Sequence, residues 1–267
     1  MPWQNATMYN IDPHIAELYD QSETYQDDVA LIRRLIAGRG PLRILEPFCG
    51  TGRILIPLAQ DGHELTGLDA AQGMLNRAQT KIDTLSPEVS ARITLTTADI
   101  VHDAWPLGFD LVILGGNCFY ELATPQEQAG CIAAAAAALK PGGFVYVDNN
   151  HMEGPLAASW QQPGVRSGFP TGICRDGTRV ESTTETIWFD INKRLARFRR
   201  STRVTRPDGR QFERTYEQQK HPVSRDEVLG WLRQFGFTIE ALYGDRAGNP
   251  YVASSERAIF WARKGSS

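Results

Sequence analysis

Two kinds of hydrophobic pattern divide the chain. In the first 150 residues, short runs that are apolar throughout alternate with longer segments whose apolar residues recur at helical spacing. Strands that are buried on both faces of a parallel sheet show such continuous runs. We therefore predict an open, mainly parallel sheet with helices on both faces. The expected strands cover residues 43–46, 63–69, 92–100, 109–114 and 144–148.

The pattern changes after residue 150. Residues 151–177 contain several glycine–proline pairs and are predicted to be loop-like. Residues 178–218 then alternate with a period of two, and turn sequences at 190–193 and 206–209 divide them into three antiparallel strands. For residues 221–267 the pattern predicts a helix followed by two strands. We predict a nucleotide-binding core with lid helices, an inserted antiparallel β subdomain that covers the substrate, and a C-terminal helix and hairpin, at 1–150, 151–220 and 221–267.

The first predicted strand runs into a glycine turn that is typical of nucleotide-binding α/β folds. It ends in Glu46, and Gly50 and Gly52 then let the backbone turn sharply beside a ligand. A dinucleotide site would carry a third glycine where Leu55 stands, and the charge of Glu46 would repel a pyrophosphate. A carboxylate at this place instead suits a ligand with an amino group and a positive sulfur.

The second predicted strand ends in another acid, Asp69, which lies 17 residues beyond Gly52. Nucleotide sites of this class place an acid about 20 residues after the glycine turn, where its oxygens accept hydrogen bonds from ribose hydroxyls. The two motifs at this spacing indicate a nucleoside ligand more strongly than either alone. An uninvolved surface position for Asp69 is the alternative.

These motifs resemble those of the class I S-adenosylmethionine (SAM) methyltransferases, whose first motif reads acid-x-x-x-Gly-x-Gly. The resemblance spans residues 15–264 and implies a Rossmann-like, seven-stranded sheet with helices on both faces, plus the inserted three-stranded subdomain. It also implies S-adenosyl-L-methionine as the cofactor and no metal. The implied cofactor residues are Tyr19, Glu46, Gly50, Gly52, Arg53, Asp69, Ala70, Met74, Asp99, Ile100, Gly115 and Gly116.

Within that class the chain is most similar to the glycine N-methyltransferase group, through residues 114–119 and 143–150. In that group the asparagine that matches Asn117 orients the substrate amine. The group's arginine for the glycine carboxylate falls at Asn150, which argues against glycine itself as the substrate. The resemblance therefore implies methylation of a small metabolite at nitrogen, with O-methylation of a hydroxy or carboxy metabolite as the main alternative.

Candidate catalytic residues are Asn117, Tyr120 and His151, which follow the fourth and fifth predicted strands. For a hydroxyl or carboxylate substrate, His151 or Glu121 is a candidate base, although a lone histidine is more often structural. Methyl transfer from a sulfonium needs mainly alignment in a dry site, so a general base is not required for a neutral amine. The candidate substrate-binding residues are Tyr25, Asn117, Asn150, Arg200 and Arg214.

Two of these candidates have structural alternatives. Arg200 shares a predicted strand face with Phe198 and Val204, and a buried arginine needs an anionic partner, which is either a substrate group or a neighbouring acid. Tyr25 belongs with Tyr9 and Tyr19 to the N-terminal helices that close over the cofactor in this family. The alternative is that these tyrosines pack the helices onto the core.

Composition narrows the classes of function. The net charge of −3 gives no general preference for nucleic acid, although residues 175–214 hold ten arginines and one lysine against six acids. Because of that excess, an RNA methyltransferase is a minor alternative. A non-catalytic SAM-binding regulator is a further one. No run reaches the roughly 20 apolar residues of a membrane span, and four unpaired cysteines suggest a cytoplasmic protein. A homodimer through the antiparallel strands is left open.

Overall fold

The computed structural model describes residues 6–150, 160 and 164–266. Its larger sheet has seven strands in the order β10-β11-β5-β4-β1-β2-β3, and β11 alone runs opposite to the other six. The predicted class I architecture is confirmed. The strands are β1 (Arg43–Pro47), β2 (Glu64–Asp69), β3 (Ile93–Thr97), β4 (Phe109–Leu114), β5 (Leu139–Asn150), β10 (Phe237–Tyr243) and β11 (Arg257–Lys264).

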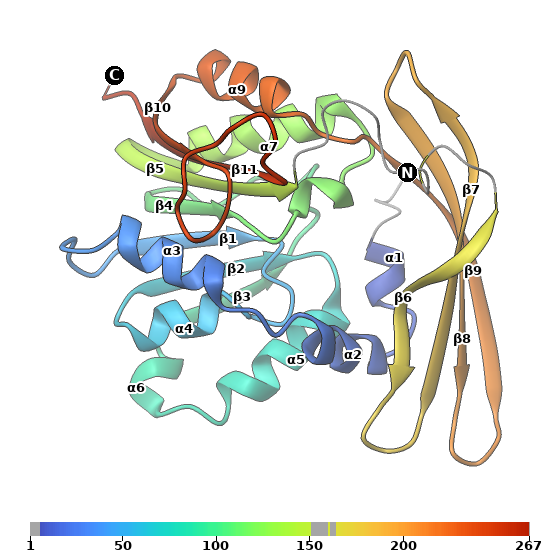
Figure 1. Cartoon of the computed structure of the whole chain (residues 1–267). Coiled ribbons are helices and arrows are strands. Elements are labelled where there is room, and N and C mark those ends of the chain that lie inside the picture. The colour runs from blue at the N-terminus through green and yellow to red at the C-terminus, as the bar shows by residue number, and fades with distance from the viewer. Residues whose placement is uncertain (1–5, 151–159, 161–163, 267) are drawn as a thin grey trace.

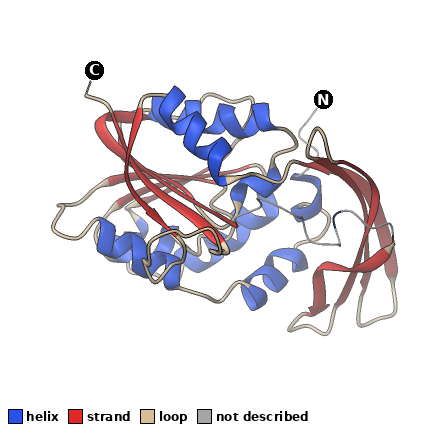
Figure 2. Cartoon of the chain, turned by 45° about the horizontal axis from the view of Figure 1, so that its top comes forward, coloured by secondary structure: helices blue, strands red, loops and turns tan. Residues whose placement is uncertain are grey.

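Helices cover both faces of this sheet (Figure 2). Helices α7 (Pro125–Ala138) and α9 (Arg225–Gln234) pack on one face, where their apolar side chains join one core cluster. Helices α3 (Asp27–Leu35) and α4 (Leu55–Gln60) pack on the other face. Helices α5 (Gln72–Ile82) and α6 (Pro87–Ser90) share this second face, whereas the 3-10 helix η1 (Cys118–Glu121) packs with the cluster of α7 and α9.

The inserted sheet has four antiparallel strands rather than the three predicted, in the order β6-β7-β8-β9. The added strand β6 falls in the segment predicted to be loop-like. Its glycines and Pro170 hid it, but an edge strand tolerates both because one side needs no partner. We call these strands the roof sheet: β6 (Val165–Ile173), β7 (Arg179–Asp190), β8 (Leu195–Thr205) and β9 (Gln211–Lys220).

Two short helices, α1 (Ala6–Tyr9) and α2 (His14–Ser22), lie between the two sheets (Figure 1). Leu18 of α2 packs against Val180 and Val204 of the roof sheet. A Cβ on Gly172 would lie only 2.8 Å from the Leu18 side chain, so the roof backbone approaches α2 closely. The roof sheet is thereby held against helices that also border the ends of the parallel strands.

Candidate active site

A pocket opens where the parallel strands end beneath α1 and α2. Gly50 and Gly52 adopt positive φ angles of 54° and 78°, which let the loop after β1 fold tightly under the pocket. The lining comes from the ends of β1, β2 and β4, from η1 and from both short helices. It comprises Tyr9, Tyr19, Glu46, Phe48, Cys49, Gly50, Arg53, Ile54, Asp69, Ala71, Met74, Gly115, Gly116, Cys118 and Glu121.

Three carboxylates line this pocket: Glu46, Asp69 and Glu121. Asp69 is fixed by two backbone donors, because the Gly50 and Ala71 N–H groups each lie 2.8 Å from one of its oxygens. Burial raises the pKa of Asp69 to about 6, and the charge of Glu121 contributes to that rise. Each carboxylate oxygen has a second acceptor site, so Asp69 can still accept two further hydrogen bonds.

Glu46 is only 5% exposed, and burial raises the pKa of its carboxyl well above the ordinary range. Its Oε2 atom has no hydrogen-bond partner among the described residues. A buried, unsatisfied carboxylate oxygen is costly in a protein interior. This oxygen therefore fits a ligand that brings a positively charged donor, such as the ammonium group of SAM.

Arg53 faces the pocket but is already paired. Its guanidinium donates to both oxygens of the buried Asp28, at 2.8 and 2.6 Å, and lies over the Tyr25 ring at 4.0 Å from the centroid. Arg246 covers the same ring at 4.2 Å and lies 3.8 Å from Asp28. Tyr25 is therefore enclosed by two arginines and does not line the pocket.

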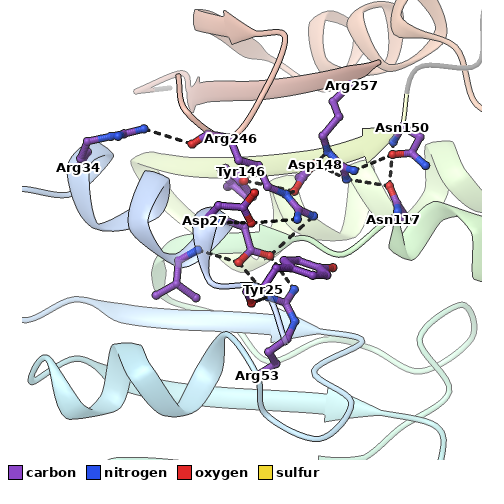
Figure 3. A network of polar contacts seen from close by, with 12 residues as sticks. Tyr25, Asp27, Arg34, Arg53, Asn117, Tyr146, Asp148, Asn150, Arg246 and Arg257 are labelled. Atoms are coloured by element: carbon purple, nitrogen blue, oxygen red, sulfur yellow. Dashed lines mark hydrogen bonds and ion pairs between the residues drawn. The ribbon is translucent and has the colours of Figure 1, made fainter. Parts of the chain in front are cut away.

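This cluster continues into a buried network of charges along the strand ends (Figure 3). Arg246 and Arg257 bind opposite oxygens of Asp148, at 2.8 and 2.7 Å. Arg257 also donates to the side-chain oxygens of Asn150, at 2.6 Å, and Asn117, at 2.9 Å. The Asn117 oxygen accepts a second bond from the Asn150 backbone N–H at 2.8 Å, which fills both of its acceptor sites.

Eight of the twelve predicted cofactor residues line the pocket. Of the other four, Gly52 lies in the loop beneath it, Ala70 follows Asp69, and Asp99 bonds to His102 and to nearby backbone N–H groups. Ile100 is buried in the core behind the strand. The lining residues that the sequence did not assign to the cofactor are Tyr9, Phe48, Cys49, Ile54, Ala71, Cys118 and Glu121. Of these, Tyr9 was predicted to belong to the helices that close over the cofactor, and Glu121 was a candidate base because it closely follows β4.

Among the residues that the structure describes, none of the predicted catalytic and substrate residues is part of the pocket wall. The Tyr120 ring packs edge-on against Trp160, with 6.2 Å between centroids, and Lys220 Nζ lies 5.8 Å from that ring. Arg200 is half-buried on the roof sheet, whereas Arg214 is exposed. His151 lies outside the described residues.

Comparisons with known proteins find methyltransferases. A methyltransferase domain family matches residues 44–143. YqeM of Bacillus subtilis, named as a candidate methyltransferase, is 28% identical over 83% of this chain and 84% of its own length. Glycine N-methyltransferase of Rattus norvegicus is 27% identical over 54% of this chain, which spans about half (52%) of that relative's length.

The fold has solved counterparts as well. A SAM-dependent methyltransferase from Clostridium acetobutylicum superposes with a TM-score of 0.72, at 17% identity, over 94% of this chain and 97% of its own. A likeness at this identity shows the fold alone. The matched domain and the named relatives indicate methyltransferase chemistry. The domain match, the named relatives and the fold support a SAM-dependent methyltransferase, and residues 44–143 carry the methyltransferase domain.

Proposed function

We propose that this methyltransferase acts on an amine nitrogen of a small metabolite, in the pocket beneath the roof sheet. The observation that carries the proposal is the third carboxylate on the pocket wall. Glu46 suits the ammonium group of SAM and Asp69 suits its ribose hydroxyls. Glu121 is then left to attract a positively charged substrate amine. The similarity to glycine N-methyltransferase supports nitrogen as the acceptor atom.

The cofactor residues in this proposal each have a defined task. Glu46 supplies its unsatisfied oxygen to the ammonium group, and Asp69 supplies its two remaining acceptor sites to the ribose. Gly115 and Gly116 leave room because neither carries a side chain. When bound, SAM supplies a methyl group on a positively charged sulfur. The chain then has to align an amine with that group and exclude water.

The amine must lose a proton before it can act as a nucleophile. Glu121 lines the pocket and would both orient the ammonium form and accept its proton. Asn117 has no free acceptor site in this structure, so we assign it a positioning task. It connects the loop after β4 to Arg257 and thereby fixes the position of the pocket wall that Glu121 lines.

Residues 151–220 form the proposed substrate-covering part. On its solvent face, glutamates pair with the arginines: Glu185 lies 3.0 Å from Arg199, and Glu213 lies 2.9 Å from Arg203. Paired surface charges give little attraction for phosphates, which weighs against RNA as the substrate. All four cysteines are free and buried, in keeping with the proposed cytoplasmic location. No helix in the described part of the chain could span a membrane.

Methyl-labelled SAM, incubated with a metabolite extract and separately with total RNA, tests the proposal. We expect the label to appear in a small molecule. Mass spectrometry of that product should place the methyl group on nitrogen. Glu121→Gln should lower that incorporation at least about tenfold while SAM binding persists. A product methylated at oxygen, or label in RNA, would overturn the amine assignment.

A further inference from the structure

The two faces of the roof sheet carry different charge patterns. Side chains alternate between faces along a strand, and the inner face is the one that meets α1 and α2. On the outer face each of Arg197, Arg199 and Arg203 lies within 4.0 Å of a glutamate. Among the described residues of β7, β8 and β9 whose side chains take the inner face, none is acidic. The inner face nevertheless carries Arg166, Arg200, Arg214 and Lys220.

Arg200 lies at the centre of this inner face. In the strand register Arg166, Thr184, Arg200 and Tyr216 form one row across all four strands. The Nη1 atom of Arg200 lies 3.7 Å from the sulfur of Met8, next to the pocket-lining Tyr9. Its Nε atom is buried without a hydrogen-bond partner among the described residues, and no described carboxylate lies within ion-pair distance. The Arg200 guanidinium also contacts the Tyr216 hydroxyl, and the buried Nε donor is left for a ligand.

Lys220 extends this positive surface to the pocket wall. It is 8% exposed, and its Nζ atom lies 4.0 Å from Glu121, which lines the pocket. Burial lowers the pKa of Lys220 to about 8, and repulsion by Arg200 adds to this, against the attraction of Glu121. Burial and repulsion by Arg200 also lower the pKa of Arg166. These cations repel one another, so an anion between them would relieve an unfavourable arrangement.

We propose that the inner face of the roof sheet, through Arg200 and Lys220, binds an anionic group of the methylated amine. Carboxylate and phosphate are the two chemistries that fit, because both accept hydrogen bonds from guanidinium and ammonium groups. Glu121 holds the amine and the neighbouring cations hold the anion, so the substrate carries both charges a short distance apart. This inference rests on the proposed function, since it assigns the substrate class for the same pocket.

The test uses the full chain saturated with S-adenosylhomocysteine, titrated with inorganic phosphate and separately with acetate, by calorimetry. We expect wild-type protein to bind at least one anion, and the preferred one identifies the chemistry. Arg200→Gln and Lys220→Met should each weaken that binding at least tenfold. The matched control is Arg199→Gln, a neighbour on the outer face, which should bind the anion as wild type does.

The outcomes separate the two proposals. Wild type that binds S-adenosylhomocysteine but neither anion would overturn the anion site and leave the methyltransferase assignment intact. Equal weakening in Arg199→Gln would overturn it too, because the effect would then follow general surface charge. Failure to bind S-adenosylhomocysteine would instead count against the proposed cofactor pocket. Two independent variants are used, so misfolding of one, detected by circular dichroism, leaves the other as the test.

Discussion

At the scale of single residues, the proposed cofactor pocket relies on two acids, to which we assign separate tasks. Glu46 offers an unsatisfied buried oxygen, whereas Asp69 is held by backbone N–H groups that fix the direction of its remaining acceptor sites. Both lie at the carboxyl ends of the adjacent parallel strands β1 and β2. Open parallel sheets bind ligands at this edge because the strand ends bring such side chains together.

Asp69→Ala should raise the dissociation constant of SAM at least tenfold. A tenfold change corresponds to about 1.4 kcal/mol of lost binding free energy. Calorimetric titration measures it directly, with Asp83→Ala, at the exposed C-cap of α5, as the control. Unchanged affinity in Asp69→Ala would remove Asp69 from the ribose site.

The affinity for SAM should also fall as the pH is lowered from 7 to 5. Burial raises the pKa of Asp69 to about 6, so its carboxylate gains a proton in that range and loses acceptor capacity. The ribose hydroxyls favour the ionised form, and binding near pH 6 should therefore release protons. Titrations in buffers of different ionisation enthalpy detect this release, and a constant affinity from pH 7 to 5 would contradict the assignment.

At the scale of elements, a charged network ties the start of α3 to the ends of β5 and β11 (Figure 3). Arg246 is 8% exposed and contacts Asp27, Asp28 and Asp148, which come from distant parts of the chain. Buried pairs of this kind are weak evidence for net stability, but removing one partner leaves a buried charge uncompensated. The network therefore fixes the geometry of the strand ends.

Arg246→Met should lower the free energy of unfolding by about 3 kcal/mol, at the lower end for a broken buried pair. Asp148 and Asp28 each keep a second arginine, which limits the loss. Arg33→Met is the control, because it breaks an exposed pair with Asp61 that contributes about 1 kcal/mol or less. Denaturant unfolding of both variants measures the difference, and equal stability would show that the network is not energetically coupled.

Asn117→Ala should lower turnover at least about tenfold while the affinity for SAM stays within about twofold of wild type, because small misplacement of reacting groups is costly. The change removes the oxygen that accepts hydrogen bonds from both Arg257 and the Asn150 N–H group. The pocket wall beside Glu121 is then no longer held in place. Turnover and SAM binding are measured on the same preparation. Equal losses in both would place Asn117 in the cofactor site.

At the scale of the whole molecule, the two sheets meet across α1, α2 and η1. The pocket belongs to the parallel sheet, whereas Arg200 and Lys220 belong to the inner face of the roof sheet. Glu121 and Lys220 join the two, at 4.0 Å. A substrate with an amine and an anionic group would contact both sheets at once, which is how this architecture would select it.

This arrangement predicts a pH dependence of the binding of acetate, which stays fully ionised above pH 7, to the protein saturated with S-adenosylhomocysteine. Lys220 faces Glu121 and Tyr120 from η1 and Arg200 from its own sheet, and burial sets its pKa at about 8. Raising the pH from 7 to 9 removes its charge, so affinity should fall over that interval. Lys220→Met should lack the dependence, and a wild-type affinity that is constant across pH 8 would contradict the role of Lys220.

The sequence predicted much of the fold and part of the pocket. Continuous apolar runs placed the parallel strands, although the fifth strand begins at Leu139, earlier than predicted, and the third ends at Thr97. The alternation of residues 178–218 indicated antiparallel strands and correctly assigned the half-buried Arg200 to the face of Phe198 and Val204. Such features follow from patterns between near neighbours in the chain, which a single sequence displays.

Tertiary structure alone decided the rest. Strand β6 was missed because its pattern is weak and its pairing with β7 gives it order. Both acceptor sites of the Asn117 side-chain oxygen are filled only because Arg257, 140 residues away, donates to it. The ion pair between Glu121 and Lys220 depends on the contact of two sheets. Local periodicity determines which elements form and which face of each is apolar. The partners of a buried charge come from contacts that the folded chain makes over long distances, and no local pattern records them.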